Sequence, residues 1–212
     1  MFSQAIDCKK GVLVTACHNE IRDRVVHLAR KAFTPSHVRN DPLIYSGPTV
    51  KRTKATTDSI AEKKYQVGVP PLDVTEQKGN LLIHDLWQNG TDSVHTMRVV
   101  NTDAKSHMTK DLEKCLQEAE RGKKRMYLEA CLQQCRHFSP FVANVDGLLG
   151  VDATATLKIL DSLLATKWKQ HHSKTCGYVK SRIAITLVRT THSCIQGSLV
   201  PEYWVSVQRP QW

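Results

Sequence analysis

Apolar residues recur at helical spacing near the start of the chain and predict its first amphipathic helix. Between residues 17 and 33, apolar side chains fall on one face and charged side chains on the other. The apolar positions are Ile21, Val25, Leu28, Ala29, Ala32 and Phe33. Pro35 ends the pattern. Residues 41–79 then hold four prolines and few large apolar residues, so we expect a short strand near Leu43–Tyr45 followed by a flexible loop.

Two segments rich in strand-forming residues predict a β-hairpin. They cover residues 80–87 and 91–100 and flank an Asn-Gly pair, whose residues tolerate the positive φ of a tight turn. A two-residue turn would place residues 80 and 96 on opposite faces of the hairpin. One extra loop residue, or a bulge, would put them on the same face.

The second half of the chain predicts three more helices and one strand. The first of these three helices follows Thr109, which is a candidate for its N-cap. Its expected buried positions are Leu112, Leu116, Ala119, Met126 and Ala130. A strand is expected at 137–145 and a helix at 152–168. The last segment, 173–197, has helical spacing, although its central IAITLV also suits a strand. This alternation of helices and strands indicates an α/β domain.

The charge of the chain favours a polyanionic partner. Thirty lysines and arginines against 20 acids give a net charge of +10 and a pI near 9.3. Beyond Ser162 the only acid is Glu202. The basic residues that we expect to meet phosphates there are Lys167, Lys169, Lys174, Lys180, Arg182 and Arg189. A solvated basic face without a ligand is the alternative.

Seven cysteines without a CxxC pair favour neither a disulfide framework nor a zinc ribbon. The apolar run at 11–17 is shorter than a signal peptide or a membrane span requires. We therefore expect an intracellular protein, nuclear or cytoplasmic, without a membrane partner.

Lys123 is an unexpected residue in the helix that follows Thr109. Steps of four and three residues from Leu112 put Lys123 on the face expected to pack against the sheet. One interpretation is that its stem covers apolar surface while the ammonium reaches water. The other is that the ammonium stabilises charge on a phosphate beside the hairpin.

Three short motifs occur in a suggestive order: KGN at Lys78–Asn80, HTMRVVN at His95–Asn101 and KKRMY at Lys123–Tyr127. Together they resemble the restriction-endonuclease-like domain at the C-terminus of non-LTR retrotransposon reverse transcriptases. Such domains show K-P-D, then D-V-x-V, then K-x-x-K-Y on a helix. HNEIRD at His18–Asp23 and FSPFVANVDGLLG at Phe138–Gly150 are similar in style to retroelement-derived copies.

This resemblance implies a PD-(D/E)XK nuclease fold, with a mixed sheet of about four strands flanked by helices in the order α-βββ-α-β. Additional C-terminal helices would follow. It also implies Mg²⁺ as cofactor, held by two carboxylates, with a lysine that supports attack on the phosphodiester. Lys123 matches the helix lysine, whereas the carboxylate positions are Asn80 and Thr96.

Neutral Asn80 and Thr96 supply no negative charge for Mg²⁺, so the resemblance implies a degenerate nuclease with weak or no cleavage. The acids that could substitute are Asp85, Asp92, Asp103 and Glu20. The alternatives are a DNA- or RNA-binding module without chemistry and a decayed relic without selected function.

The expected organisation has four parts. The N-terminal segment and first core helix occupy 1–40, and the flexible loop with its short strand occupies 41–79. The nuclease-like core covers 80–170, and a basic C-terminal helix and tail cover 171–212.

Overall fold

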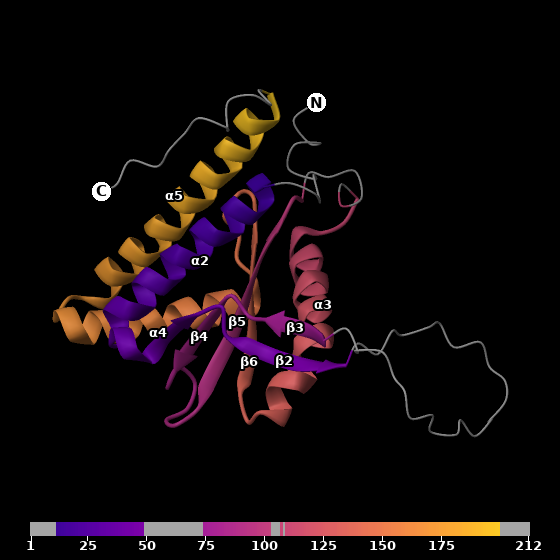
Figure 1. Ribbon diagram of the computed structural model, residues 1–212. Helices are drawn as coiled ribbons and strands as arrows, with labels where there is room; N and C mark the ends of the chain where they lie inside the picture. The colour runs from indigo at the N-terminus through magenta and orange to yellow at the C-terminus, as the bar shows by residue number, and fades with distance from the viewer. Residues whose placement is uncertain (1–11, 49–73, 103–106, 108, 200–212) are drawn as a thin grey trace, which may run out of the picture.

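The computed structural model describes residues 12–48, 74–102, 107 and 109–199 (Figure 1). Its elements follow in the order α2 (Val12–Ala32), η1 (Pro35–His37), β1 (Val38–Asn40), β2 (Leu43–Pro48), β3 (Val74–Lys78), β4 (Leu81–His84), β5 (Asp92–Val100), α3 (Leu112–Gln133), β6 (His137–Asn144), α4 (Val151–Trp168) and α5 (His172–Leu199). The helices and strands confirm the expected α/β class.

Four strands form a mixed sheet in the order β1-β4-β5-β6. The β1–β4 and β4–β5 pairs are antiparallel, whereas β5 and β6 are parallel. Parallel neighbours need a crossover connection, and α3 provides it. Strands β2 and β3 pair in a separate two-stranded antiparallel sheet, which lies between β1 and β4 in the chain.

Helices cover both faces of the four-stranded sheet (Figure 1). One face carries Leu81, Ile83, Met97 and Phe141, which share the largest apolar cluster with α2, α4 and α5. Alternate residues of β5 and β6 point the other way, toward α3. There Val94 and Phe138 belong to one small cluster, and Val100 and Val142 to another.

The first helix, the strand at β6 and the two last helices confirm the sequence pattern within a few residues. Strand β3 was expected to be loop, and its polar composition explains why no strand pattern is visible in the sequence. The short strand expected near Leu43–Tyr45 is present as β2 and extends to Pro48, and residues 49–73 of the expected loop lie outside the described residues. The β4–β5 connection runs over residues 85–91, longer than the two-residue turn considered.

Helix α3 differs from the prediction at its cap and on its buried face. Asp111, not Thr109, is the N-cap, and its side chain accepts a hydrogen bond from the Glu113 N–H. Leu112 and Met126 were expected to be buried but are 46% and 60% exposed. Leu112 is the first residue of α3, whereas Leu116 and Ala119 are buried as expected. Farther along, a stripe drawn at 3.5 residues per turn drifts from the true contact face of a helix. The packed side chains shift accordingly to Tyr127 and Cys131.

Candidate functional site

The pairing of β4 with β5 ends at Leu81 and His95, whereas β5 runs on to Val100. Beyond His95, no described strand pairs with this edge of β5, which we call its open edge. The Asn80 N–H donates to the His95 carbonyl at 2.9 Å, and Asn80 Oδ1 accepts the Met97 N–H at 2.7 Å. His18 of α2 donates to the Met97 carbonyl. The Asn80 carboxamide therefore lies along the edge of β5, where it takes the position of a partner strand. It does not project from one face of the hairpin.

Gly79, between β3 and β4, is closely approached by neighbouring side chains. Its N–H donates to the Pro42 carbonyl at 2.8 Å, toward the small β2–β3 sheet. A Cβ on Gly79 would lie 2.6 Å from Val94 Cγ1, closer than packed atoms approach. The glycine of KGN thus has a steric reason in this fold.

Thr96, Arg98 and Lys123 form a polar seam between the two small apolar clusters under α3. Thr96 and Arg98 alternate with Val94 and Val100 on this face of β5. Lys123 lies one turn from Ala119 and one turn from Tyr127, which belong to those clusters. Thr96 is 2% exposed, and its hydroxyl has no hydrogen-bond partner among the residues that the structure describes.

The seam is electropositive. Burial, and then the nearby Arg98 guanidinium, lower the pKa of Lys123. Burial also lowers the pKa of His18, followed by the charges of Lys123 and Arg98, while its bond to the Met97 carbonyl opposes the shift. The Lys123 ammonium lies 5.4 Å from the Tyr127 ring centroid. Among the described residues, no carboxylate pairs with Lys123 or Arg98. A bound anion would relieve this mutual repulsion.

Asp85 and Asp92, two of the acids considered as substitutes, lie at the opposite end of the β4–β5 pair. Asp92 accepts from His84 Nδ1 at 2.9 Å, and Asp85 lies 3.5 Å from His37 Nε2. Four residues of strand, about 13 Å, separate Asp92 from Thr96. The structure therefore does not bring these two carboxylates to the seam.

Of the other two acids, Asp103 falls outside the described residues. Glu20 is exposed and lies two residues after His18, a spacing that puts it on another side of α2. In the part of the chain that the structure describes, no group of three or more His, Cys, Asp or Glu side chains could hold a metal ion. The residues of the seam do not fit Mg²⁺, because a cation bound there would meet two positive charges and no described carboxylate.

The basic residues of the C-terminal quarter lie in the other helical layer. Lys167 and Lys169 are at the end of α4, whereas Lys174, Lys180, Arg182 and Arg189 lie on α5. All six are exposed. Lys167 Nζ donates to the Phe33 carbonyl at 2.8 Å, and the Arg182 guanidinium lies 5.3 Å from the Tyr178 ring centroid. Because α5 packs on α2 and α4, these residues are separate from the polar seam.

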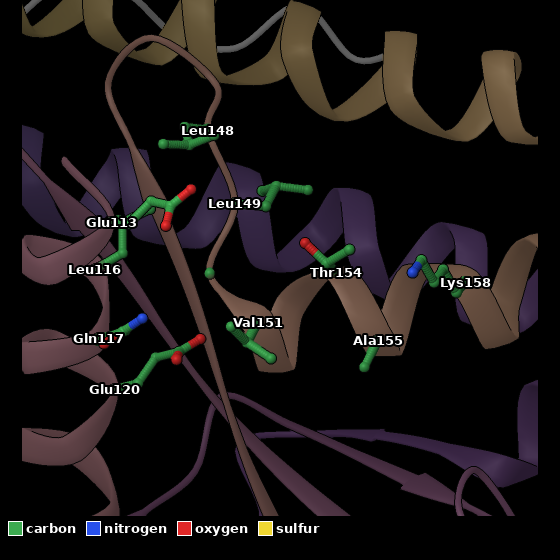
Figure 2. Close-up of a pocket in the computed structure, with 11 residues that line it drawn as sticks. Glu113, Leu116, Gln117, Glu120, Leu148, Leu149, Val151, Thr154, Ala155 and Lys158 are labelled. Atoms are coloured by element: carbon green, nitrogen blue, oxygen red, sulfur yellow. The ribbon is translucent and has the colours of Figure 1, made fainter.

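A pocket of about 360 Å³ lies between α3 and the start of α4 (Figure 2). Glu120 points from α3 toward Val151 and accepts hydrogen bonds from the N–H groups of Val151 and Asp152, the latter at 3.1 Å. Burial raises the pKa of this carboxyl group. The N-cap position itself is Gly150, which has no side chain to cap α4. The Glu120 carboxylate is thus engaged in capping a helix.

Sequence reasoning missed His18 and Arg98 as site residues. The signal for Arg98 was present, because it lies two residues after Thr96 and so shares its face of the strand. No local signal identifies His18, since its contact with Met97 joins segments far apart in the sequence.

The substitution Asn80→Asp is expected to raise the pKa of His18. Its carboxylate can accept the same Met97 N–H bond and adds a negative charge beside the residue whose carbonyl His18 contacts. Proton NMR titration of the histidine signals, assigned with a His18→Gln variant, measures the shift. Asn89→Asp makes the same charge change in the β4–β5 connection and should leave His18 unaltered. An unchanged His18 pKa in Asn80→Asp would contradict the geometry at Met97.

None of the described helices is long and apolar enough to cross a membrane. No protein-family model matches the sequence, and no curated protein matches it.

Proposed function

We propose that this chain is a nucleic-acid-binding domain with a restriction-endonuclease-like fold, in which the polar seam binds backbone phosphates without metal-dependent cleavage. One observation carries the proposal. The positively charged side chains of Lys123 and Arg98 lie near each other on the side of β5 that faces α3, and no described carboxylate neutralises them. Clustered cations without acidic partners are typical of surfaces that bind polyanions.

The topology supports the proposed restriction-endonuclease-like fold. With the β2–β3 pair set aside as an insertion, the elements α2, β1, β4, β5, α3 and β6 follow the order α-βββ-α-β that the sequence resemblance implies. The three motifs also come together in space. Asn80 lies along the open edge of β5, and Thr96 lies on the face of β5 that is covered by α3, the helix of Lys123.

The same residues explain why cleavage would be lost while binding is kept. The neutral Asn80 side chain accepts a hydrogen bond from the Met97 N–H, and the neutral Thr96 side chain is buried. Neither offers an anionic ligand to a metal ion. Without such ligands, the charge that develops on the phosphate and leaving oxygen lacks metal stabilisation, which is worth several kcal/mol. Lysine and arginine bind phosphate in the ground state without a metal ion.

DNA affinity measured over a range of salt concentrations tests the proposal. If about four phosphates are contacted, the affinity should fall roughly two orders of magnitude between about 50 and 200 mM salt. In parallel, plasmid incubated with the protein and Mg²⁺ should remain supercoiled. A salt-independent affinity would reject phosphate binding. Mg²⁺-dependent nicking that Lys123→Ala abolishes would instead show that the site is an active nuclease.

A further inference from the structure

A second group of basic side chains adjoins the polar seam, with which it shares Arg98. This group lines a pocket of about 480 Å³ between β5 and α3. Its cationic side chains are Arg98 from β5, and Arg121 and Arg125 from α3, with His107 beside them. Val100 and Ala119 form part of its apolar wall. We call it the arginine pocket.

The guanidinium groups of the arginine pocket converge from two elements. Arg121 and Arg125 are four residues apart, so they point from the same side of α3. Arg98 approaches from the strand below and belongs to the polar seam as well. The seam and the arginine pocket are therefore neighbouring binding positions that share one side chain.

Among the described residues, Glu118 is the one acid that lines the arginine pocket, and it is already engaged. Glu118 accepts from Lys110 Nζ at 2.7 Å, and this hydrogen bond lowers the pKa of the Glu118 carboxyl group. Within the described ranges, no carboxylate forms an ion pair with Arg98 or Arg125. The pocket consequently presents more positive charge than its own acid can balance.

We propose that the arginine pocket binds the terminal phosphate of a nucleic-acid strand whose neighbouring backbone phosphate lies in the polar seam. This inference rests on the proposed function, because the seam must first hold the strand. A phosphate monoester carries close to two negative charges at neutral pH, against one for a phosphodiester, and more oxygens for forked guanidinium contacts.

Fluorescence anisotropy with three short single-stranded oligonucleotides of one sequence, labelled internally, tests this inference. One carries a 5′-phosphate, one a 3′-phosphate, and one hydroxyl groups at both ends. The unaltered protein should bind one of the phosphorylated strands about tenfold more tightly than the hydroxyl strand, since a charge-assisted contact is worth about 1.4 kcal/mol or more. The preferred strand identifies the end that is bound.

The variant Arg121→Gln/Arg125→Gln should bind all three strands equally, while the circular dichroism spectrum shows that it is folded. Both side chains are exposed on α3, so their loss leaves the packed face of the helix intact. The control Lys180→Gln/Arg189→Gln on α5 should keep the preference.

Three results would overturn the inference. Equal binding of all strands by the unaltered protein would reject terminal recognition and leave the proposed function standing. A preference that survives in the Arg121/Arg125 variant would place the terminal phosphate elsewhere on the protein. Absence of binding to any strand would reject the proposed function and this inference together.

Discussion

The paired substitution Arg98→Ala and Lys123→Ala is expected to weaken DNA binding about a hundredfold, because two charge-assisted phosphate contacts are lost at roughly tenfold each. The dependence on salt should become shallower as well, by about two phosphate contacts. Titrations of the variant and the unaltered protein at several salt concentrations measure both effects. The expected loss depends on the position of these cations above β5, where burial and Arg98 already depress the Lys123 pKa.

A matched pair on the other layer separates the seam from general surface charge. Lys180→Ala/Arg189→Ala removes the same net charge from exposed positions on α5. This control should lose much less affinity, and its salt dependence should stay close to that of the unaltered protein. Equal losses in the two double variants would contradict the seam as the binding site. A larger loss in the α5 variant would favour the basic C-terminal surface expected from the charge distribution.

The free energy of unfolding should fall by about 3 kcal/mol as the pH is lowered from 7 to 4, owing to His95. His95 is 1% exposed, and burial lowers its pKa to about 4. In the unfolded chain its pKa is near 6.5. Between these two values the unfolded state binds a proton that the folded state excludes, so stability is complete above pH 6.5 and is lost as the pH falls toward 4. Urea unfolding at a series of pH values measures the change.

A His95→Gln variant isolates this contribution, since glutamine does not titrate and can still bond to the Ser93 hydroxyl, which lies 3.0 Å from His95 Nε2. The variant should lose less stability over the same pH interval than the unaltered protein. His18, whose pKa burial also lowers, contributes in the same direction in both proteins and cancels in the comparison. Parallel curves for the two proteins would show that His95 is not the titrating group.

The elements with a clear period were predictable from sequence, and those defined by their neighbours were not. The apolar face of α2 and the run of β6 are visible in the residues themselves. Strand β3 has no apolar alternation, because its structure depends on pairing with β2. Met126 was assigned to the buried face of α3 by a spacing that drifts over the roughly four turns from Leu112, whereas Tyr127 makes the contact.

The candidate site likewise has residues that the sequence predicts and residues that it does not. Lys123 was expected to face the sheet, and the structure places it near Arg98 on that side. Asn80 was considered as a face residue of a hairpin. Its carboxamide instead takes up the hydrogen bond of an unpaired strand edge, a role that depends on where β4 ends. The contribution of His18 required the packing of α2 against β5 and has no counterpart in the local sequence.

The Glu120 carboxylate that completes the first turn of α4 has a consequence for folding. Because Gly150 supplies no cap, the free N–H groups of Val151 and Asp152 are satisfied only when α3 has docked. The Lys124–Asp152 ion pair, at 2.7 Å, joins the same two helices. Local opening of either helix therefore removes part of the stability of the other. This dependence couples two segments on opposite faces of the sheet into one cooperative unit.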